Sequence, residues 1–295
     1  MPELPDVVVY CERLAALAVG SPLQHLRVSS PWVLRSVDPT PQDVEGRRLT
    51  GVRRIGKRIV LQLEDGYFIV IHLMVAGRLR RRPPATTIPK RRGLAAFDFP
   101  NDTFLLTEEG TKSRASIHLV WGEEGLRDHD RGGIEPLEAG ADEFAASLVA
   151  ERHTLKRALT DPRLIAGIGG AYADEIMHRA GVSPLARTDR LGREALSRLH
   201  ASAQQVLSEW AARLRTEVGD GFPETVTAFH TDMAVHGRYG LPCPVCGAPV
   251  QRIVYADNET NYCPGCQTGG RILADRSLSR LLKEDWPHCL EDLEG

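Results

Sequence analysis

The stretch that does most to define the fold is CPVCGAPVQRIVYADNETNYCPGC, residues 243–266. Cys243 and Cys246 form one C-x2-C pair, and Cys263 and Cys266 form a second pair after an interval of sixteen residues. Two such pairs together supply the four thiolates of a tetrahedral zinc site. Because protein fills all four positions, the spacing predicts one structural Zn2+. The residues between the pairs predict a β-hairpin, and a finger of this kind either closes a small fold or binds nucleic acid.

The composition of the 295-residue chain is typical of a globular protein with several domains, because 42% of its residues are hydrophobic and 26% are charged. No apolar run approaches the roughly 18 residues that a membrane span needs, and the start of the chain lacks the pattern of a secretory signal. The two cysteines outside the zinc pairs, Cys11 and Cys289, do not indicate a disulfide scaffold. We therefore expect a cytoplasmic protein without membrane contact.

Local charge is more informative than the net charge of -2. Residues 47–58 carry six basic side chains, and residues 78–92 carry seven more with no acid among them. A basic face of this kind can follow the phosphates of a nucleic acid. Charged strand edges that face solvent have the same pattern, so the charge runs alone do not establish a DNA-binding surface.

The order of the expected elements predicts an α+β chain with more than one domain. Apolar residues in the range 5–19 predict an N-terminal helix. From residue 24 to about 120 the pattern is that of strands, with hairpin turns expected at 65–66 and 101–102. The periodicity at 141–218 is helical.

The segment LIAGIGGAYADEIMHRAG, residues 164–181, places three glycines directly before a helix. Their spacing does not match a dinucleotide-binding fingerprint and predicts a tight turn between two helices. Backbone N–H groups at the start of the second helix, at Gly170, would suit a phosphate, although a plain helical hairpin has the same pattern. Glu175 and His178 lie three residues apart on this helix, and we expect a surface pair rather than a metal site.

The chain opens with MPELPDVVVY, and its second residue is a candidate nucleophile. If Met1 is removed, Pro2 presents a secondary amine that titrates about 2–3 pH units below lysine, and a neutral amine forms a Schiff base with an aldehyde-like carbon. Glu3 could move protons during that reaction. Lys57, at the start of a strand, could hold a phosphate or act as an acid. Considered without the rest of the chain, the N-terminal sequence is explained more simply by a proline at position 2 that has no catalytic role.

These pieces occur in one order: a PELP-D-V start, a GKR strand, an HL-x-x-x-GRL strand, a GIG-x-x-YADEI turn and a finger that ends CPGCQ. In this order and spacing the chain resembles the formamidopyrimidine-DNA glycosylase / endonuclease VIII family, from Pro2 to about Gln267. The resemblance implies an N-terminal helix with a two-sheet β-sandwich, a helix–two-turn–helix domain and a C-terminal zinc β-hairpin finger. The corresponding ranges are 1–136 for the catalytic β-sandwich domain, 137–236 for the helix–two-turn–helix DNA-binding domain, 237–270 for the finger and 271–295 for a tail.

The resemblance also implies a bifunctional DNA glycosylase and AP lyase of base-excision repair. Pro2 would attack C1′ of a damaged, in particular an oxidised, nucleoside, expel the base and leave a Schiff base, after which elimination breaks the strand. Glu3 would be the acid/base that opens the sugar, and Lys57 would contact the phosphate beside the lesion. Asp6 stands at a position that is usually acidic in the family. The expected partner is double-stranded damaged DNA, bound by a monomer that flips the target nucleotide out of the duplex.

The positions that fill the gap left by a flipped nucleotide depart from the family pattern. The wedge methionine of the family falls at Val75, and Met74 stands one position earlier. The loop that probes the opposite base is TEEGTKSRAS here, with Lys112 and Arg114 as its basic residues and no aromatic side chain.

The expected phosphate contacts depart as well. Gly170 replaces the phosphate-binding asparagine of the helical turn, and Asn258 replaces the finger-tip arginine. Glu175 matches a position that touches the lesion base in some members of the family. Because the departures affect DNA readout while the tip is intact, two alternatives remain open. One is an AP-site lyase with little glycosylase activity, and the other is a non-catalytic zinc-finger protein that binds damaged DNA.

Overall fold

The computed structural model describes residues 1–110, 114–224, 226, 230–255, 258–275, 279, 281 and 286–293. The chain forms two compact units. The first unit consists of Met1–Arg131 and Trp210–Thr227, and the second consists of Gly132–Glu209 and Ala228–Gly295. Within the described part of the chain, no helix has the length and apolar character to cross a membrane.

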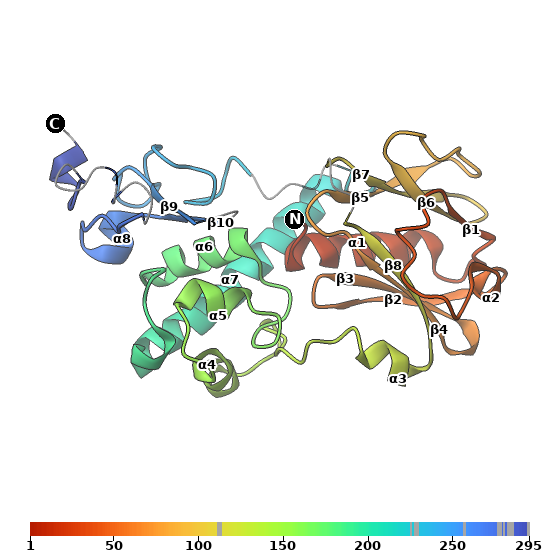
Figure 1. Cartoon of the computed structure of the whole chain (residues 1–295), viewed down its shortest axis with the longest axis horizontal. Coiled ribbons are helices and arrows are strands. Elements are labelled where there is room, and N and C mark those ends of the chain that lie inside the picture. The colour runs from red at the N-terminus through yellow and green to blue at the C-terminus, as the bar shows by residue number, and fades with distance from the viewer. Residues whose placement is uncertain are drawn as a thin grey trace. The chain divides into compact units, whose positions relative to one another are not determined.

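The first unit combines an N-terminal helix with two antiparallel sheets, and Figure 1 labels their elements. One sheet has the strand order β1-β6-β7-β5, and the other has the order β2-β3-β4-β8. The elements of this unit are α1 (Leu4–Ala18), β1 (His25–Val28), α2 (Pro41–Val44), β2 (Leu49–Ile55), β3 (Arg58–Leu63), η1 (Glu64–Gly66), β4 (Tyr67–His72), β5 (Gly77–Arg82), β6 (Gly93–Asp98), β7 (Thr103–Glu108), β8 (Ser116–Trp121) and α3 (Gly122–Arg127).

Both hairpins expected from the sequence are confirmed. Strands β3 and β4 pair antiparallel across the short 3-10 turn η1, where Asp65 and Gly66 have φ values of +58° and +76°. Glycine adopts this left-handed conformation without strain, and aspartate tolerates it better than most residues. Strands β6 and β7 pair antiparallel across the turn at 99–102.

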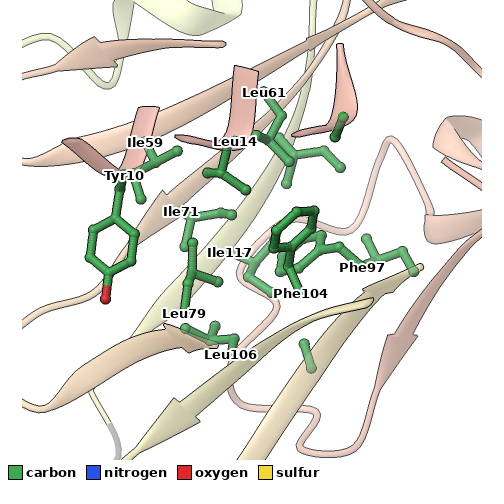
Figure 2. Close-up of a cluster of buried hydrophobic side chains, with 14 of the residues drawn as sticks. Tyr10, Leu14, Ile59, Leu61, Ile71, Leu79, Phe97, Phe104, Leu106 and Ile117 are labelled. Carbon is green, nitrogen blue, oxygen red and sulfur yellow. The ribbon is translucent and has the colours of Figure 1, made fainter. Parts of the chain in front are cut away.

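One hydrophobic core joins the two sheets of the first unit to α1 (Figure 2). Alternate residues of β3, β4, β7 and β8 enter it, as the two-residue period of a strand requires. Tyr10 and Leu14, one turn apart on α1, are buried in the same core. The residues labelled in Figure 2 are Tyr10, Leu14, Ile59, Leu61, Ile71, Leu79, Phe97, Phe104, Leu106 and Ile117. Burial of this face of α1 fixes the helix, and therefore the tip that precedes it.

The segment that follows α7 (Arg193–Val218) also holds α1 in the first unit. The ring of Phe222 lies 5.6 Å from that of Tyr10, between centroids. Arg13 Nε donates to the carbonyl of Gly221 at 2.8 Å. Phe222 also lies 5.3 Å from Phe104 of β7, between ring centroids, so it belongs to the same core. Aromatic packing and the hydrogen bond from Arg13 therefore help to hold α1 against the core.

The second unit contains the helical region and the cysteine-rich finger. It contains the part of α7 up to Glu209. Its other elements are α4 (Ala141–Val149), α5 (Leu155–Thr160), α6 (Gly170–Ala180), η2 (Thr188–Arg190), β9 (Gln251–Tyr255), β10 (Asn258–Tyr262), α8 (Pro264–Thr268) and η4 (Glu291–Leu293). The expected turn between two helices is confirmed, because residues 161–169 connect α5 to α6 and Gly167 has a φ of +80°. The expected finger hairpin is the antiparallel pair β9–β10.

The architecture agrees with the predicted fold class: a helix with a β-sandwich, a helical domain and a β-hairpin finger. The division into units differs from the predicted ranges in two respects. The first break follows Arg131, and the end of α7 belongs to the first unit. The finger is grouped with the helices because β10 packs on α6, where Asn261 N donates to the carboxylate of Asp174 at 3.2 Å.

Candidate active site and zinc centre

The N-terminal tip is buried and capped. Glu3 is the N-cap of α1, and its backbone N–H donates to Asp6 Oδ2 at 2.7 Å. The Glu3 side chain accepts the backbone N–H of Asp6 in return, which completes a capping box. Both side chains are only 3% exposed, and Pro2 is buried as well. The residues PELPD therefore give the second residue a fixed position at the head of α1.

Burial changes the protonation of groups at the tip. It raises the pKa of Asp6 to about 7, although the hydrogen bond from the Glu3 N–H opposes the shift. Asp6 Oδ1 has no hydrogen-bond partner among the described residues. Burial also lowers the pKa of the Met1 amine, and the positive charge of Arg78 acts in the same direction, while the charge of Glu3 opposes both. An amine in this environment is neutral at a lower pH than in water, and the neutral form is the nucleophile.

Lys57 lies in the turn between β2 and β3, directly after Gly56, whose φ is +55°. Burial lowers the pKa of its ammonium group, and the negative charge of Glu3 partly offsets that shift. The charge of Lys57 also acts on the amine of Met1. The charges of Glu3 and Lys57 therefore both act on the N-terminal amine, and the catalytic roles expected for Glu3 and Lys57 stay predictions.

Two residues near the tip were not identified from the sequence. Arg78, in β5, acts electrostatically on both the N-terminal amine and Asp6. His72 ends β4 and lies opposite Arg58, and burial together with the charges of Arg58 and Lys57 lowers the pKa of His72 to about 4. The motif HL-x-x-x-GRL contains both residues, so the signal was present, but their proximity to the tip depends on strand register.

The two wedge candidates lie between β4 and β5. Met74 has a φ of +53°, and Val75 is 56% exposed. Arg114 is exposed, and its backbone N–H donates to the carboxylate of Glu108 at 2.9 Å. Lys112 lies outside the described residues. The roles expected for these four positions in filling the gap left by a flipped nucleotide stay predictions.

The second basic run is largely paired with acids. Arg80 Nη2 lies 2.7 Å from a Glu109 oxygen, and Arg81 Nε lies 2.6 Å from Asp102. Arg82 pairs with Glu224 at 3.0 Å. These pairs favour the charged strand edge as the explanation for this part of the run.

The two residues of the second unit that we expect to contact DNA phosphates each lie at the start of an element. Gly170 is the first residue of α6, with Gly169 as the N-cap, and a Cβ added at position 170 would meet no atom within 4 Å. Asn258 is exposed at the first position of β10. Phosphate binding at both positions stays a prediction.

The expectation that Glu175 and His178 form a surface pair is wrong, because they are 6% and 7% exposed. The Glu175 carboxylate accepts backbone N–H groups from Ala234 at 2.8 Å and from Val235 and His236 at 2.9 Å. It therefore fixes the segment that leads into the finger. The base contact predicted for Glu175 would have to come from a carboxylate that already accepts three hydrogen bonds.

Asp174, the neighbour of Glu175 on α6, is fully buried and also saturated with partners. It accepts from Lys156 Nζ at 2.8 Å, from His236 Nδ1 at 2.9 Å and from the backbone N–H of Asn261 at 3.2 Å. Lys156 donates in addition to the carbonyl of Glu259 at 2.6 Å. This network joins α5, α6 and the finger hairpin through hydrogen bonds to a charged group, which are stronger than neutral ones.

The four cysteines form the site of one structural Zn2+. Cys243 Sγ lies 3.9 Å from Cys266 Sγ, and Cys246 Sγ lies 3.3 Å from Cys263 Sγ. Four sulfurs at about 2.3 Å from a tetrahedral zinc are about 3.8 Å apart, so the cluster fits the ion. With four thiolates bound, the ion holds the two knuckles of the finger together and has no open position for a substrate.

The described part of the tail packs on the finger. Leu273 N donates to the hydroxyl of Tyr262 at 2.7 Å, and Asp275 Oδ2 accepts from Val254 N at 2.6 Å. Most of the amphipathic stretch 276–285 lies outside the described residues.

Comparison with known proteins agrees with this architecture. Three family descriptions match the chain: the formamidopyrimidine-DNA glycosylase N-terminal domain at residues 1–111, the H2TH domain of the same enzymes at 133–218, and a zinc finger found in FPG and IleRS at 240–269. A formamidopyrimidine-DNA glycosylase of Thermus thermophilus is 35% identical over 292 residues, which span 92% of this chain and all of that protein. The chain belongs to the formamidopyrimidine-DNA glycosylase family.

Other members of the family extend this comparison. A Mycobacterium tuberculosis protein described as formamidopyrimidine-DNA glycosylase-like and uncharacterised is 43% identical over 151 residues, which cover 51% of this chain and 94% of that protein. The crystal structure of MutM (Fpg) from Thermus thermophilus superimposes with a TM-score of 0.76 at 33% identity, over 90% of this chain and 98% of that one. A MutM bound to DNA that contains carbocyclic 8-oxo-G has a TM-score of 0.79 at 22% identity, covers 90% of this chain and all of that one, and supports the fold.

Proposed function

We propose that this chain is a bifunctional DNA glycosylase and AP lyase of base-excision repair, and that the amine of Pro2, freed by removal of Met1, is its nucleophile. The amine lone pair attacks C1′ of the damaged nucleoside, and the bond from C1′ to the base breaks. The base leaves with the bonding electrons and takes up a proton. Loss of the amine proton and opening of the sugar ring then give a Schiff base. Elimination from that intermediate cleaves the strand.

The observation that carries this proposal is the buried, capped tip. A dispensable N-terminus is usually exposed and mobile. Here Glu3 and Asp6 cap α1, and α1 is buried in a core that also contains Phe222. Glu3 is adjacent to the nucleophile and would protonate the ring oxygen as the sugar opens. Lys57 would bind the phosphate next to the lesion.

The lesion we expect is an oxidised purine in duplex DNA. Curated relatives that are 30–35% identical over most of this chain are named formamidopyrimidine-DNA glycosylases, and a formamidopyrimidine is a purine with an opened imidazole ring. We expect the enzyme to act as a monomer in the cytoplasm, on the nucleoid if its source is bacterial.

A second candidate function is an AP lyase with little glycosylase activity. The observation that favours it is the set of side chains at the expected readout positions. Val75 is a short exposed wedge, Gly170 has no side chain, and Asn258 is uncharged. Each lost hydrogen bond to a charged group costs about 1.5–3 kcal/mol, so extrusion of a paired base would suffer more than action on an abasic site.

The test is reductive trapping with borohydride. Duplexes that carry 8-oxoguanine, a formamidopyrimidine, an oxidised pyrimidine or an abasic site are each incubated with the protein and with a Pro2→Gly form, after mass spectrometry of the N-terminus. An adduct with a damaged base supports the glycosylase, and an adduct with the abasic site alone supports the second candidate. If no adduct forms although Pro2 is shown to be the first residue, the protein is a non-catalytic zinc-finger protein that binds damaged DNA.

A further inference from the structure

A fifth potential metal ligand lies at the zinc site. His178 Nε2, on α6, is 3.3 Å from Cys243 Sγ. The donor atoms of His178, Cys243, Cys263 and Cys266 all lie within 4.8 Å of one another. These four residues offer the four donor atoms that a zinc ion needs without Cys246.

The distance from His178 to Cys243 fits two arrangements. A nitrogen that donates its hydrogen to a thiolate sulfur lies at this separation, as in an outer-shell contact. A nitrogen and a sulfur bound to the same zinc, at about 2.0–2.1 Å and 2.3 Å, would be about 3.5 Å apart. The imidazole therefore needs only a small displacement to exchange one role for the other.

Contacts other than the metal help to position His178. The side chain is 7% exposed on a helix whose preceding turn carries Glu175, and the Glu175 carboxylate holds residues 234–236 by three backbone hydrogen bonds. Cys243 follows that segment and is 3% exposed. The imidazole and the first knuckle of the finger are thus held against each other by contacts that contain no zinc.

The four cysteines differ in their access to solvent. Cys243 and Cys263 are buried and Cys266 is partly buried, whereas Cys246 is exposed. Electrophiles in solvent therefore reach Cys246 first, and Cys246 is the cysteine that is absent from the set of His178, Cys243, Cys263 and Cys266.

We propose that His178 is a reserve zinc ligand that replaces Cys246. With all four cysteines on the metal, Nε2–H donates a hydrogen bond to the Cys243 thiolate. When the Cys246 thiolate is lost, the imidazole proton resides on Nδ1 and the Nε2 lone pair binds Zn2+, which then has three sulfur ligands and one nitrogen ligand. The finger keeps its metal, and α6 becomes linked to the finger because His178 coordinates the same ion.

The test measures zinc content and ligand type rather than catalysis. Full-length Cys246→Ala, His178→Phe and the double variant are purified with zinc and exposed to a weak chelator, and bound zinc is quantified. Cys263→Ala, which removes a donor common to both sets, is the control for zinc loss. The same proteins are loaded with Co2+, because its visible spectrum distinguishes four sulfur ligands from three sulfurs with one nitrogen.

The proposal predicts one zinc per chain in Cys246→Ala, a Co2+ band shifted in the direction of a nitrogen ligand, and loss of the metal in the double variant and in Cys263→Ala. The difference in zinc affinity between Cys246→Ala and the double variant should exceed the roughly 10–100-fold effect of an outer-shell hydrogen bond. Zinc loss from Cys246→Ala would overturn the proposal, and so would zinc retention in the double variant.

A second measurement does not depend on the folding of Cys246→Ala. The zinc-loaded protein, in a Cys289→Ser background, is alkylated at Cys246 with iodoacetamide and the site is verified by peptide mass spectrometry. Zinc should remain bound when His178 is present and should be released from the His178→Phe form. Equal release from both forms would contradict the proposal.

Discussion

Each unit contains a pair of buried carboxylates, Glu3 and Asp6 in the first and Asp174 and Glu175 in the second, and the number of hydrogen bonds that Asp6 accepts differs from the number that each member of the second pair accepts. Asp174 and Glu175 on α6 each accept three hydrogen bonds from the groups that surround them. Asp6 on α1 accepts a single backbone N–H at one oxygen, and its other oxygen has no partner in the described structure. All are nearly inaccessible to solvent, so burial alone does not explain the difference.

We infer from this difference that the α6 pair holds structure, while Asp6 is suited to the proton chemistry that the proposed function places at the tip. A buried polar network whose members are all hydrogen-bonded rigidifies its surroundings. A buried carboxyl with too few donors has a raised pKa and can exchange a proton near neutral pH. The α6 pair therefore fixes the finger, while Glu3 and Asp6 lie beside the amine to which the proposed function assigns the chemistry.

Removal of zinc should have the largest effect on folding. It should affect the part of the second unit that Asp174 and Glu175 hold together and leave α1, with Glu3 and Asp6, unchanged. Chelation removes a contribution to folding of about 10–16 kcal/mol, the magnitude measured for isolated zinc fingers, so the finger should unfold and DNA binding should be lost. Hydrogen exchange should rise in β9 and β10 and stay unchanged in α1. If DNA affinity survives verified zinc loss, the finger does not contribute to DNA binding.

Asp174→Ala should have the next largest effect. It leaves Lys156, His236 and the Asn261 N–H without their common acceptor, and loss of one partner from a buried ion pair costs about 3–5 kcal/mol. Urea denaturation at pH 7 measures the loss. Asp189→Ala, which removes an exposed partner of arginines, should cost far less, and equal losses would contradict the role given to the network.

Asp6→Asn should change how stability depends on pH. A folded-state pKa of about 7, raised from its ordinary range, gives stability that is present at acid pH and lost as the pH rises through 7. Between pH 5 and pH 8 the wild type should therefore lose roughly 2–3 kcal/mol relative to the asparagine variant. Denaturation midpoints over this range measure the difference.

A suitable control for Asp6→Asn is Asp43→Asn. Hydrogen bonds from Thr40 lower the pKa of the exposed Asp43, so its stabilisation is complete above about pH 5 and lost only in acid. The stability of Asp43→Asn relative to the wild type should therefore be constant between pH 5 and pH 8. A flat profile for Asp6→Asn would show that Asp6 is charged throughout.

Lys57→Ala should have the smallest effect of these substitutions, and it should lower the rate of strand cleavage rather than the free energy of unfolding. Loss of a charged contact to a phosphate costs about 1.5–3 kcal/mol, or about 10–100-fold in strand cleavage. Stability should change little, because the substitution removes an ammonium group whose burial is unfavourable. Single-turnover cleavage and thermal unfolding of the same preparation separate the two. A collapse in stability with normal cleavage per folded molecule would contradict the assignment.

Much of this arrangement could be predicted from sequence, because the signals are local. The cysteine spacing, the turn at Asp65 and Gly66 and the N-terminal helix each depend on residues close together in the chain. The burial of Glu175 and His178 could not be predicted, because their hydrogen-bond partners lie 59 to 65 positions later in the chain. The pairing of Arg81 with Asp102 was missed for the same reason, since it depends on the register of β5 and β7.

The most direct test of the central claim is peptide mapping of the borohydride-reduced complex with DNA. The protein is trapped on a duplex with an oxidised purine, digested, and the peptide that carries the nucleotide is sequenced by mass spectrometry. The account predicts a single modified residue, Pro2, at the N-terminus of the peptide. Attachment of the DNA at Lys57 or at any other lysine would show that the buried tip is not the nucleophile.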